Sequence, residues 1–387
     1  MRLAFDTELI ALRDEFRKPL AGATLRSALE WIDTGATMDQ VLWARLSQLG
    51  WLGTVIPAEH GGSGIDELML CLQAEEIGRA LAPIPFTASA CGYAAGLALA
   101  ADADAQASLL PAVVAGSAVG VLLTDGCWRR SPRLQQSSQA DALIDGVTGN
   151  VLDGACATAA IARVGQGAEA TLVHIDLSGT ARSIATDCLD PLHPCASFDF
   201  ERTPARVLTR GENAEAVWQQ IEDRYALFTA FEQIGAAGAA LEMARQYALE
   251  RHAFGRPIGS FQGLKHTFAD LFASLDLARS NCLYGAAALN SATEQLHEAA
   301  AVARISATEA FRRCARGNLQ VHGALGVTWD SGCHLYYRRA QALAGHPGSI
   351  DDWKDRLVQS LLERSCDLGI AASTDHANES DRYPGTI

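Results

Sequence analysis

The amino-acid sequence predicts an α+β protein of several domains, in which a helical region, a small β region and a second helical region follow one another. Three observations predict it: the chain has 387 residues, 49% of them are hydrophobic, and the apolar periodicity changes twice. A chain of this size buries more than one core, since domains hold about 100 to 200 residues. We place an N-terminal helical domain at 1–114, a middle β domain at 115–210, a C-terminal helical domain at 211–370 and a polar tail at 371–387.

Helical periodicity marks the first and the third region. Near the N-terminus, apolar residues recur at spacings of three and four positions, as in Val41, Leu42, Leu46 and Leu49, which places them on one face of a helix. The charged first 18 residues predict an amphipathic helix rather than a signal peptide. From about residue 212, a helical pattern rich in Ala and Leu returns.

The middle region consists of short β-type runs. These are AVGVLLT, ALIDGV, ATLVHIDL and RVLTR, separated by Gly, Asp and Ser with no helix-length pattern between them. No strand is followed by GxGxxG, and no GxxxxGK[ST] occurs. A β domain between two helical domains therefore argues against a Rossmann oxidoreductase and against a P-loop nucleotide hydrolase.

Charge and cysteine content exclude further classes. The formal charge of −14 argues against nucleic acid and membrane surfaces as partners, and no apolar run approaches the length of a transmembrane helix. The ten cysteines form no CxxC pair, so we expect reduced thiols and a cytoplasmic location. The segment CLDPLHPC offers Cys188, His193 and Cys195, which is a weak ligand set, and we predict no metal site.

A helical segment that breaks and resumes predicts an anion site. RQYALERHAFGRPIGSFQGLKHTFADL is interrupted at Phe254-Gly255 and resumes near Ser260. Arg251 ends the first helix and Gln262 begins the next, so a guanidinium and a helix N-terminus lie together, as a phosphate or pyrophosphate requires. The alternative is that Arg251 caps its own helix or pairs with a neighbouring carboxylate.

A second interrupted helix lies at QVHGALGVTWDSG, residues 320–332. Gly323 and Gly326 break the helix just after Gln320 and His322. Glycines allow a ligand to approach the backbone closely, although an ordinary turn between helices explains the same spacing.

These two segments resemble the C-terminal domain of the acyl-CoA dehydrogenase family. WARLSQLGWLGTVIPAEHGGSGIDELMLCLQAEEIGRALAPIPF is similar to the first domain of that family, so the resemblance covers about 38–86 and 230–345. It implies a helical N-terminal domain, a β domain of barrel or sandwich type and a C-terminal four-helix bundle, assembled as dimers or tetramers. It also implies FAD as cofactor, bound between the β domain and the bundle, and an acyl-CoA substrate.

The resemblance assigns five residues to the flavin of a neighbouring subunit. Arg251 matches the arginine presented to the pyrophosphate. The other neighbour-side contacts match Phe254, Gln262, Gln320 and Gly323.

The half of the flavin site that a chain supplies to itself departs from the family. In place of a TEPGAGSD-type loop the sequence reads LLTDGCWRRSPRLQQ, in which Thr124 can supply the hydroxyl but the Gly-rich loop is missing. In place of a WITNG-like strand it reads GNVLDGACATAAIARV. The resemblance therefore implies a damaged own-chain half beside an intact neighbour-facing half.

The position of the family's catalytic base also carries no basic residue in this sequence. The Glu of its YEG-type motif falls at or beside Pro347 by counting from Arg338-Arg339. A minority of members carry the Glu early in the first bundle helix, where counting reaches Tyr225 and the nearest carboxylates are Glu222 and Asp223. We take Asp223 as the candidate base, against the alternative of a solvated acidic helix start.

Together these features predict a subunit of an FAD-dependent acyl-CoA dehydrogenase that works with a homologous partner. We expect an α2β2 assembly in which the partner supplies the base, a substrate that resembles the steroid side-chain CoA thioesters of heteromeric bacterial members, and an electron-transfer flavoprotein as acceptor. Two alternatives stay open. One is a self-sufficient homotetramer for branched or short acyl-CoA with Asp223 or Glu222 as base, and the other is a structural subunit without flavin.

Overall fold

The computed structural model describes residues 7–138, 140–185, 187–289 and 293–367. Its N-terminal part is a set of short helices. They are α1 (Thr7–Arg17), α2 (Leu25–Asp33), α3 (Gln40–Gln48), α4 (Glu67–Ala80), α5 (Ala95–Ala100) and α6 (Ala103–Val114). A π-helical segment, Thr87–Ala94, leads into α5.

Side-chain caps explain where these short helices begin. Thr24 accepts a hydrogen bond from the backbone N–H of Ser27 at the start of α2. Asp39, Asp66 and Asp102 cap α3, α4 and α6 in the same way. Each cap satisfies an N–H group that has no partner within its helix, which fixes the first turn.

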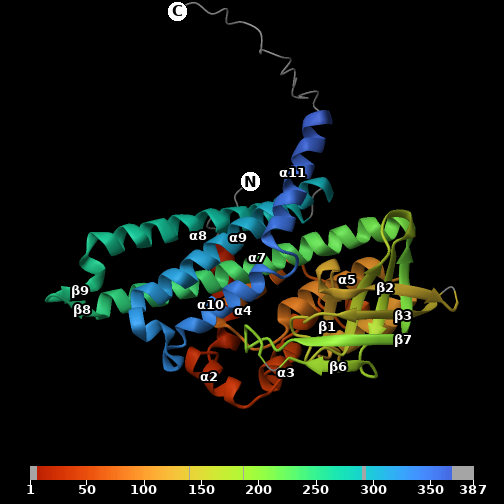
Figure 1. Ribbon diagram of the computed structural model, residues 1–387, viewed down its shortest axis with the longest axis horizontal. Coiled ribbons are helices and arrows are strands. Elements are labelled where there is room, and N and C mark those ends of the chain that lie inside the picture. The colour runs from red at the N-terminus through yellow and green to blue at the C-terminus, as the bar shows by residue number, and fades with distance from the viewer. Residues whose placement is uncertain (1–6, 139, 186, 290–292, 368–387) are drawn as a thin grey trace, which may run out of the picture.

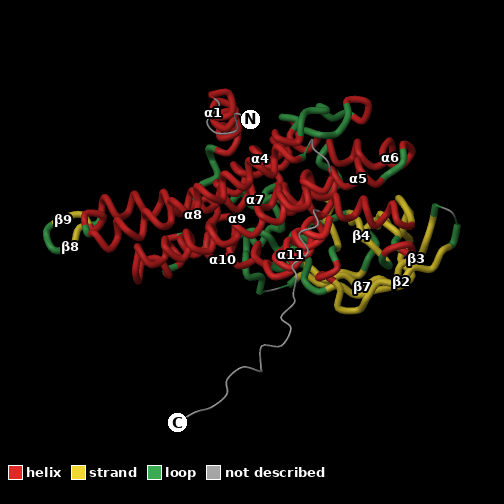
Figure 2. The backbone as a smooth tube through the Cα atoms, turned by 90° about the horizontal axis from the view of Figure 1, so that it is seen from above, coloured by secondary structure: helices red, strands yellow, loops and turns green. Residues whose placement is uncertain are grey.

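The middle of the chain forms one curled seven-stranded sheet (Figures 1 and 2). Its strands are β1 (Gly120–Leu123), β2 (Trp128–Gln136), β3 (Asp141–Thr148), β4 (Ala159–Val164), β5 (Thr171–Asp176), β6 (Ala181–Ile184) and β7 (Ala196–Arg210). The order is β1-β4-β5-β7-β3-β2, with β6 beside β7. Only the β1–β4 pair is parallel among the described strands of this sheet.

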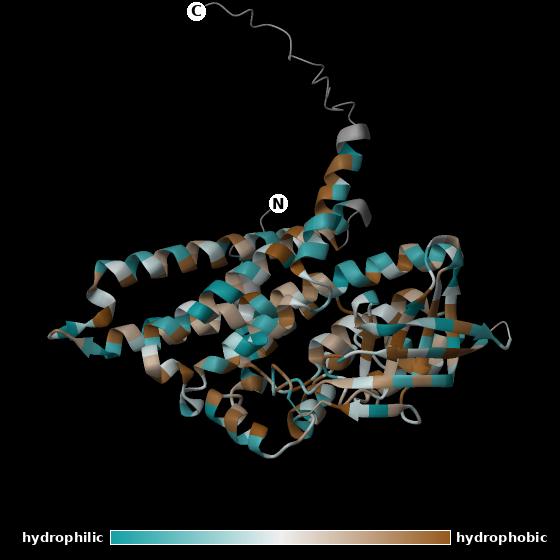
Figure 3. Cartoon of the chain, in the orientation of Figure 1, coloured by the Kyte–Doolittle hydropathy of each residue, from teal (hydrophilic) through white to brown (hydrophobic). Residues whose placement is uncertain are grey.

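The four apolar runs found in the sequence lie in β1, β3, β5 and β7, whereas β2, β4 and β6 were not predicted. Strand β2, WRRSPRLQQ, lies at the edge of the sheet and is mostly exposed (Figure 3). Because most of its residues are polar, it lacks the apolar alternation that predicts a strand. Strand β4, AAIARV, is buried almost throughout and lacks the alternation that marks a half-buried strand.

The C-terminal part is a bundle of long helices. It consists of α7 (Gly211–Glu250), α8 (Gln262–Ala288), α9 (Thr293–His322), α10 (Cys333–Ala344) and α11 (Ile350–Asp367), with the short hairpin β8 (His252–Ala253) and β9 (Arg256–Pro257) between α7 and α8. Helices α7, α8 and α9 lie side by side, and α11 projects from the body (Figure 1).

Two glycines allow α4 to cross α7 at close range. A Cβ atom at Gly78 would overlap the carbonyl oxygen of Glu232, and one at Gly235 would overlap that of Glu75. This crossing fixes the N-terminal helices against the bundle.

The helix–sheet–helix order confirms the predicted fold class. Helix α6 ends at Val114, β7 ends at Arg210 and α7 begins at Gly211, but the domain boundaries themselves stay a prediction. The polar tail at 371–387 lies outside the described residues. None of the described helices combines the length and apolar character of a membrane span.

Candidate functional site

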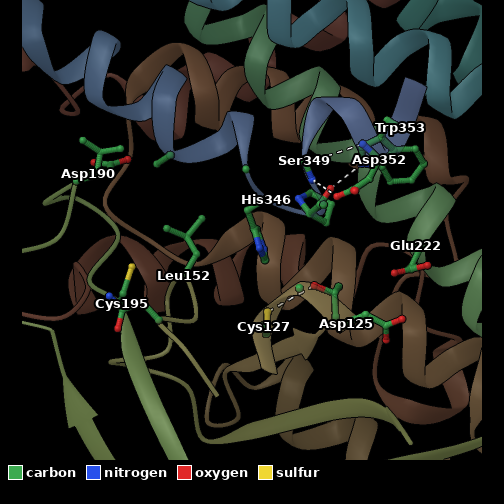
Figure 4. Close-up of a pocket in the computed structure, with 18 of the residues that line it drawn as sticks. Asp125, Cys127, Leu152, Asp190, Cys195, Glu222, His346, Ser349, Asp352 and Trp353 are labelled. Atoms are coloured by element: carbon green, nitrogen blue, oxygen red, sulfur yellow. Dashed lines mark hydrogen bonds between the residues drawn. The ribbon is translucent and has the colours of Figure 1, made fainter. Parts of the chain in front are cut away.

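A cavity of about 910 Å³ opens between the β region and the bundle (Figure 4), a size typical of small-molecule sites. The turn after β1, the loop before β7, α7 and the connection from α10 into α11 form its wall. The lining residues that matter here are Thr124, Cys127, Cys188, Asp190, Cys195, Glu222, His346, Pro347, Trp353 and Arg356.

His346 and Tyr225 form a neutral pair at the cavity. The hydroxyl of Tyr225 on α7 lies 2.9 Å from His346 Nε2. Burial, together with the nearby Arg304 charge, lowers the pKa of His346 to about 4, and burial raises the pKa of Tyr225 well above its ordinary value. Both groups are therefore uncharged at neutral pH, and His346 is a weak base.

Pro347 is held rigidly in the cavity wall. Its carbonyl oxygen accepts a hydrogen bond from Trp353 Nε1 at 2.7 Å, and the preceding His346 carbonyl accepts one from the buried Arg304 at 2.7 Å. The counted position of the family's base thus faces the cavity with a side chain that cannot accept a proton.

Adjacent carboxylates on α7 face different surroundings. Glu222 lines the cavity, and Arg356 on α11 donates to its carboxylate at 3.0 Å. Burial raises the pKa of Glu222, against the opposing charge of Arg356. Asp223 does not line the cavity, because its fully buried carboxylate pairs with His297 Nδ1 on α9 at 2.9 Å.

The own-chain half of the flavin site does not fit a flavin. Thr124 lines the cavity, but its hydroxyl lies 3.5 Å from Cys127 Sγ and forms a hydrogen bond with it. One short turn, Asp125–Cys127, joins β1 to β2, so no glycine loop presents successive N–H groups. Six carboxylates line the wall: Asp125, Asp187, Asp190, Glu222, Asp352 and Asp355. Arginines pair with Asp125, Asp190 and Glu222. Asp187, Asp352 and Asp355 have no ion-pair partner among the described residues, and their charge disfavours an anionic ligand here.

The neighbour-side residues lie together at the opposite end of the bundle. The β8–β9 hairpin is at the end farthest from the sheet (Figure 1). Arg251 follows the last residue of α7, and among the described residues its guanidinium has no hydrogen-bond or ion-pair partner. Phe254 is 97% exposed. Gln262, Gln320 and Gly323 are exposed as well.

This exposed end fits a diphosphate. The first backbone hydrogen bond of α8 is donated by Lys265 to Phe261 at 3.1 Å, so the N–H groups of Gln262, Gly263 and Leu264 have no partner within the helix and can face an anion. Across the hairpin, the carbonyl oxygen of Arg251 accepts a hydrogen bond from the Ile258 N–H at 2.8 Å, which holds residue 251 beside the segment that leads into α8. Gly323, in the left-handed region with φ of 60°, leaves open space above its backbone.

The structure also accounts for the CLDPLHPC segment. His193 Nδ1 lies 2.6 Å from Asp153 Oδ1, while the backbone N–H of Cys195 donates to Cys188 Sγ at 3.1 Å. Within the described ranges, no group of three or more His, Cys, Asp and Glu residues is arranged to hold a metal ion.

The sequence did not reveal the His346–Tyr225 pair or the role of Arg356. Counting did reach Tyr225 and Pro347 as family positions. The neighbouring His346 was the available signal, but its partner is 121 residues away along the chain.

Family models cover both helical parts of this chain. Residues 6–117 match the N-terminal domain of acyl-CoA dehydrogenase, and residues 223–351 match its C-terminal domain. With this fold and this arrangement, the chain belongs to the acyl-CoA dehydrogenase family, whose members are FAD-dependent oxidoreductases. The resemblance seen in the sequence is thereby confirmed.

Two relatives come from Mycobacterium tuberculosis. The acyl-CoA dehydrogenase IpdE2 is 33% identical over 307 residues, which cover 79% of this chain and 82% of the relative. The acyl-CoA dehydrogenase FadE34 is 30% identical over 92% of this chain, which spans only 48% of that relative.

Solved structures share the fold along nearly the whole chain. A variant of the Tcur3481-Tcur3483 steroid ACAD has a TM-score of 0.82 and 26% identity, with 93% of this chain and 99% of that chain covered. The ChsE4-ChsE5 complex from M. tuberculosis has a TM-score of 0.85 and 22% identity, covering 94% and 99%.

Proposed function

We propose that this chain is one subunit of a heteromeric acyl-CoA dehydrogenase. It completes the FAD site of a related partner, and the partner carries the catalytic base. The observation that carries the proposal is an asymmetry. The exposed bundle end around Arg251 is equipped for a diphosphate, whereas the chain's own cavity is lined by carboxylates and has Pro347 at the position of the base.

The chemistry explains why the base must come from elsewhere. Dehydrogenation removes a proton from C2 of the thioester, while FAD, when bound, accepts the hydride from C3. A base must reach the C2 proton directly and have a suitable pKa. In this cavity, His346 has its pKa lowered to about 4, and Glu222 is held by Arg356 at 3.0 Å.

Arg251, Gln262, Gln320 and Gly323 would hold the pyrophosphate end of the partner's FAD. Arg251 brings a full charge with no competing partner among the described residues, so binding requires no ion pair to break. Phe254 is exposed in the single chain, and covering such a ring contributes about 1.5–3 kcal/mol to assembly. This end of the bundle therefore gains from contact with another subunit.

We infer an α2β2 assembly with an acyl-CoA substrate and an electron-transfer flavoprotein as acceptor. The paired names of the Tcur3481-Tcur3483 and ChsE4-ChsE5 structures support a two-chain assembly, and the description of the former as a steroid ACAD supports a steroid side-chain thioester. A cytoplasmic location is part of the same proposal.

A self-sufficient homotetramer is the second candidate, and one observation favours it. Glu222 lines the cavity and burial raises its pKa, as a general base requires. Asp223 does not line the cavity, since its carboxylate is directed at His297.

Expression of the chain alone and together with the dehydrogenase gene beside it separates the candidates. The absorbance of bound flavin is recorded for each purified sample. Flavin in the co-expressed complex but not in the single chain supports the proposal. Flavin in the chain alone contradicts it and supports the homotetramer, and absence of flavin from both samples supports a structural subunit.

A further inference from the structure

The loop 188–195, CLDPLHPC, is closed at its base by the sheet. Strands β6 and β7 pair with Ile184 opposite Ala196, and the N–H of Ala185 donates to the carbonyl oxygen of Cys195 at 2.9 Å. This pairing brings the two ends of the loop together, so Cys188 and Cys195 meet although seven positions separate them.

The two thiols are neighbours. Cys195 donates its backbone N–H to Cys188 Sγ at 3.1 Å, and the contact between the two thiols, after burial, raises the pKa of Cys195. His193, the third residue that a metal site would need, is turned away to Asp153. The loop therefore brings two sulfur atoms together but does not form a set of metal ligands.

Both cysteines are accessible from the cavity. Each lines its wall and each is partly exposed. By contrast, Cys71 and Cys91 are wholly buried in the helical core, out of reach of a dissolved oxidant. Cys188 and Cys195 are therefore close to each other and accessible to a dissolved oxidant.

We propose that Cys188 and Cys195 form a reversible disulfide, which makes this loop a site of oxidative modification in the cavity wall. A small disulfide such as oxidised glutathione is the oxidant. Nothing in the proposed dehydrogenation requires this reaction.

The exchange balances in two steps. One cysteine sulfur, after losing its proton, attacks a glutathione sulfur, breaks the glutathione S–S bond and forms a mixed disulfide with release of one glutathione thiolate. The second cysteine loses its proton and displaces the remaining glutathione, which forms the protein S–S bond. Two protein thiols lose two electrons, one oxidised glutathione becomes two thiols, and the two protons pass to these products.

The disulfide would constrain a loop that connects β6 to β7 and packs against the bundle. Within the loop, Asp190 pairs with Arg339 on α10, and Leu192 is buried in the core shared with the helices. A ring closed by the disulfide restricts the motion of this wall. Because burial raises the pKa of the Cys195 thiol, the step in which Cys195 attacks should be slow at neutral pH and accelerate about tenfold per pH unit while its thiolate is the minor form.

The test uses the full chain in buffers with graded ratios of oxidised to reduced glutathione at two pH values, followed by alkylation and mass spectrometry. We expect the native protein to lose two alkylatable thiols and two hydrogen atoms, with a Cys188–Cys195 cross-linked peptide that dithiothreitol removes. Cys127→Ser is the matched control, because Cys127 lines the same cavity but contacts Thr124; it should oxidise like the wild type.

Cys188→Ser and Cys195→Ser should yield a glutathione adduct instead of a cross-link. Two outcomes would overturn the proposal, and both are measured on the unsubstituted protein, so a variant that misfolds does not change the conclusion. They are free Cys188 and Cys195 at every glutathione ratio, and a disulfide between other cysteines. Neither outcome depends on flavin or turnover, so the subunit proposal is tested separately.

Discussion

Glu222 on α7 and Arg356 on α11 form an ion pair of 3.0 Å in the cavity wall. The pair fixes α11 against α7 and occupies the one α7 carboxylate that reaches the cavity. Arg356 therefore holds the Glu222 carboxylate, so it is not free to take a proton from a substrate. Whether Glu222 is needed for turnover distinguishes the heteromer from the self-sufficient homotetramer.

Glu222→Gln tests this directly. If the partner supplies the base, the assembled enzyme should keep kcat within about threefold, whereas loss of a general base lowers kcat by on the order of 10²–10⁴. The measurement is kcat of the purified complex. Arg356→Lys serves as control, because it keeps the charge in the wall. A loss of kcat in Glu222→Gln alone would favour the self-sufficient enzyme.

Asp223→Asn should change stability and its pH dependence rather than turnover. The hydrogen bond that His297 donates to the Asp223 carboxylate raises the pKa of His297 above 6.5, so this pair stabilises the fold fully below about pH 6.5 and the contribution is lost as pH rises through the raised pKa. Urea unfolding between pH 5 and pH 9 should show this decline in the wild type, and the variant should lack it. Loss of turnover in a folded Asp223→Asn protein would make Asp223 the base and refute the account.

Arg251→Ala should weaken FAD binding in the complex. Loss of one charge-assisted hydrogen bond to a phosphate costs about 1.5–3 kcal/mol, which corresponds to a roughly 10- to 150-fold higher Kd. Fluorescence titration of the apo-complex measures it. Arg245→Ala is the matched control, since Arg245 is exposed on the same helix but paired with Glu242 at 2.6 Å. A Kd within about twofold of the wild type would remove Arg251 from the flavin site.

Pro347→Glu should not create activity in the chain alone. The backbone here is fixed by Trp353 and Arg304, and the carboxylate-lined wall does not hold a flavin ring. Acyl-CoA oxidation is assayed with an artificial electron acceptor. Turnover by this single variant without a partner would show that only the base was missing.

The sequence predicted the fold well where periodicity is strong. The helices and the strands β1, β3, β5 and β7 follow apolar patterns, but the polar edge strand β2 and the almost wholly buried β4 carry no alternation. The candidate site was harder to predict from the sequence. Glu222 and Asp223 are adjacent on one helix, so only the packing of α9 and α11 decides that Glu222 meets the cavity and Asp223 meets His297.

The His346–Tyr225 contact shows the same limit. Counting brought Tyr225 and Pro347 to family positions from separate motifs, yet nothing in either motif indicates that residues 225 and 346 touch. The contact arises from the return of the chain after α10 onto α7. Contacts between residues so far apart in the chain cannot be predicted from the spacing of residues within a short motif.

The number of FAD molecules per chain tests the central claim most directly. The co-expressed complex is purified, its mass is determined by light scattering, and its flavin is released and quantified. We predict two FAD per four chains in an α2β2 complex, with turnover abolished when the partner's base is removed. Four FAD in a tetramer of this chain alone would contradict the account.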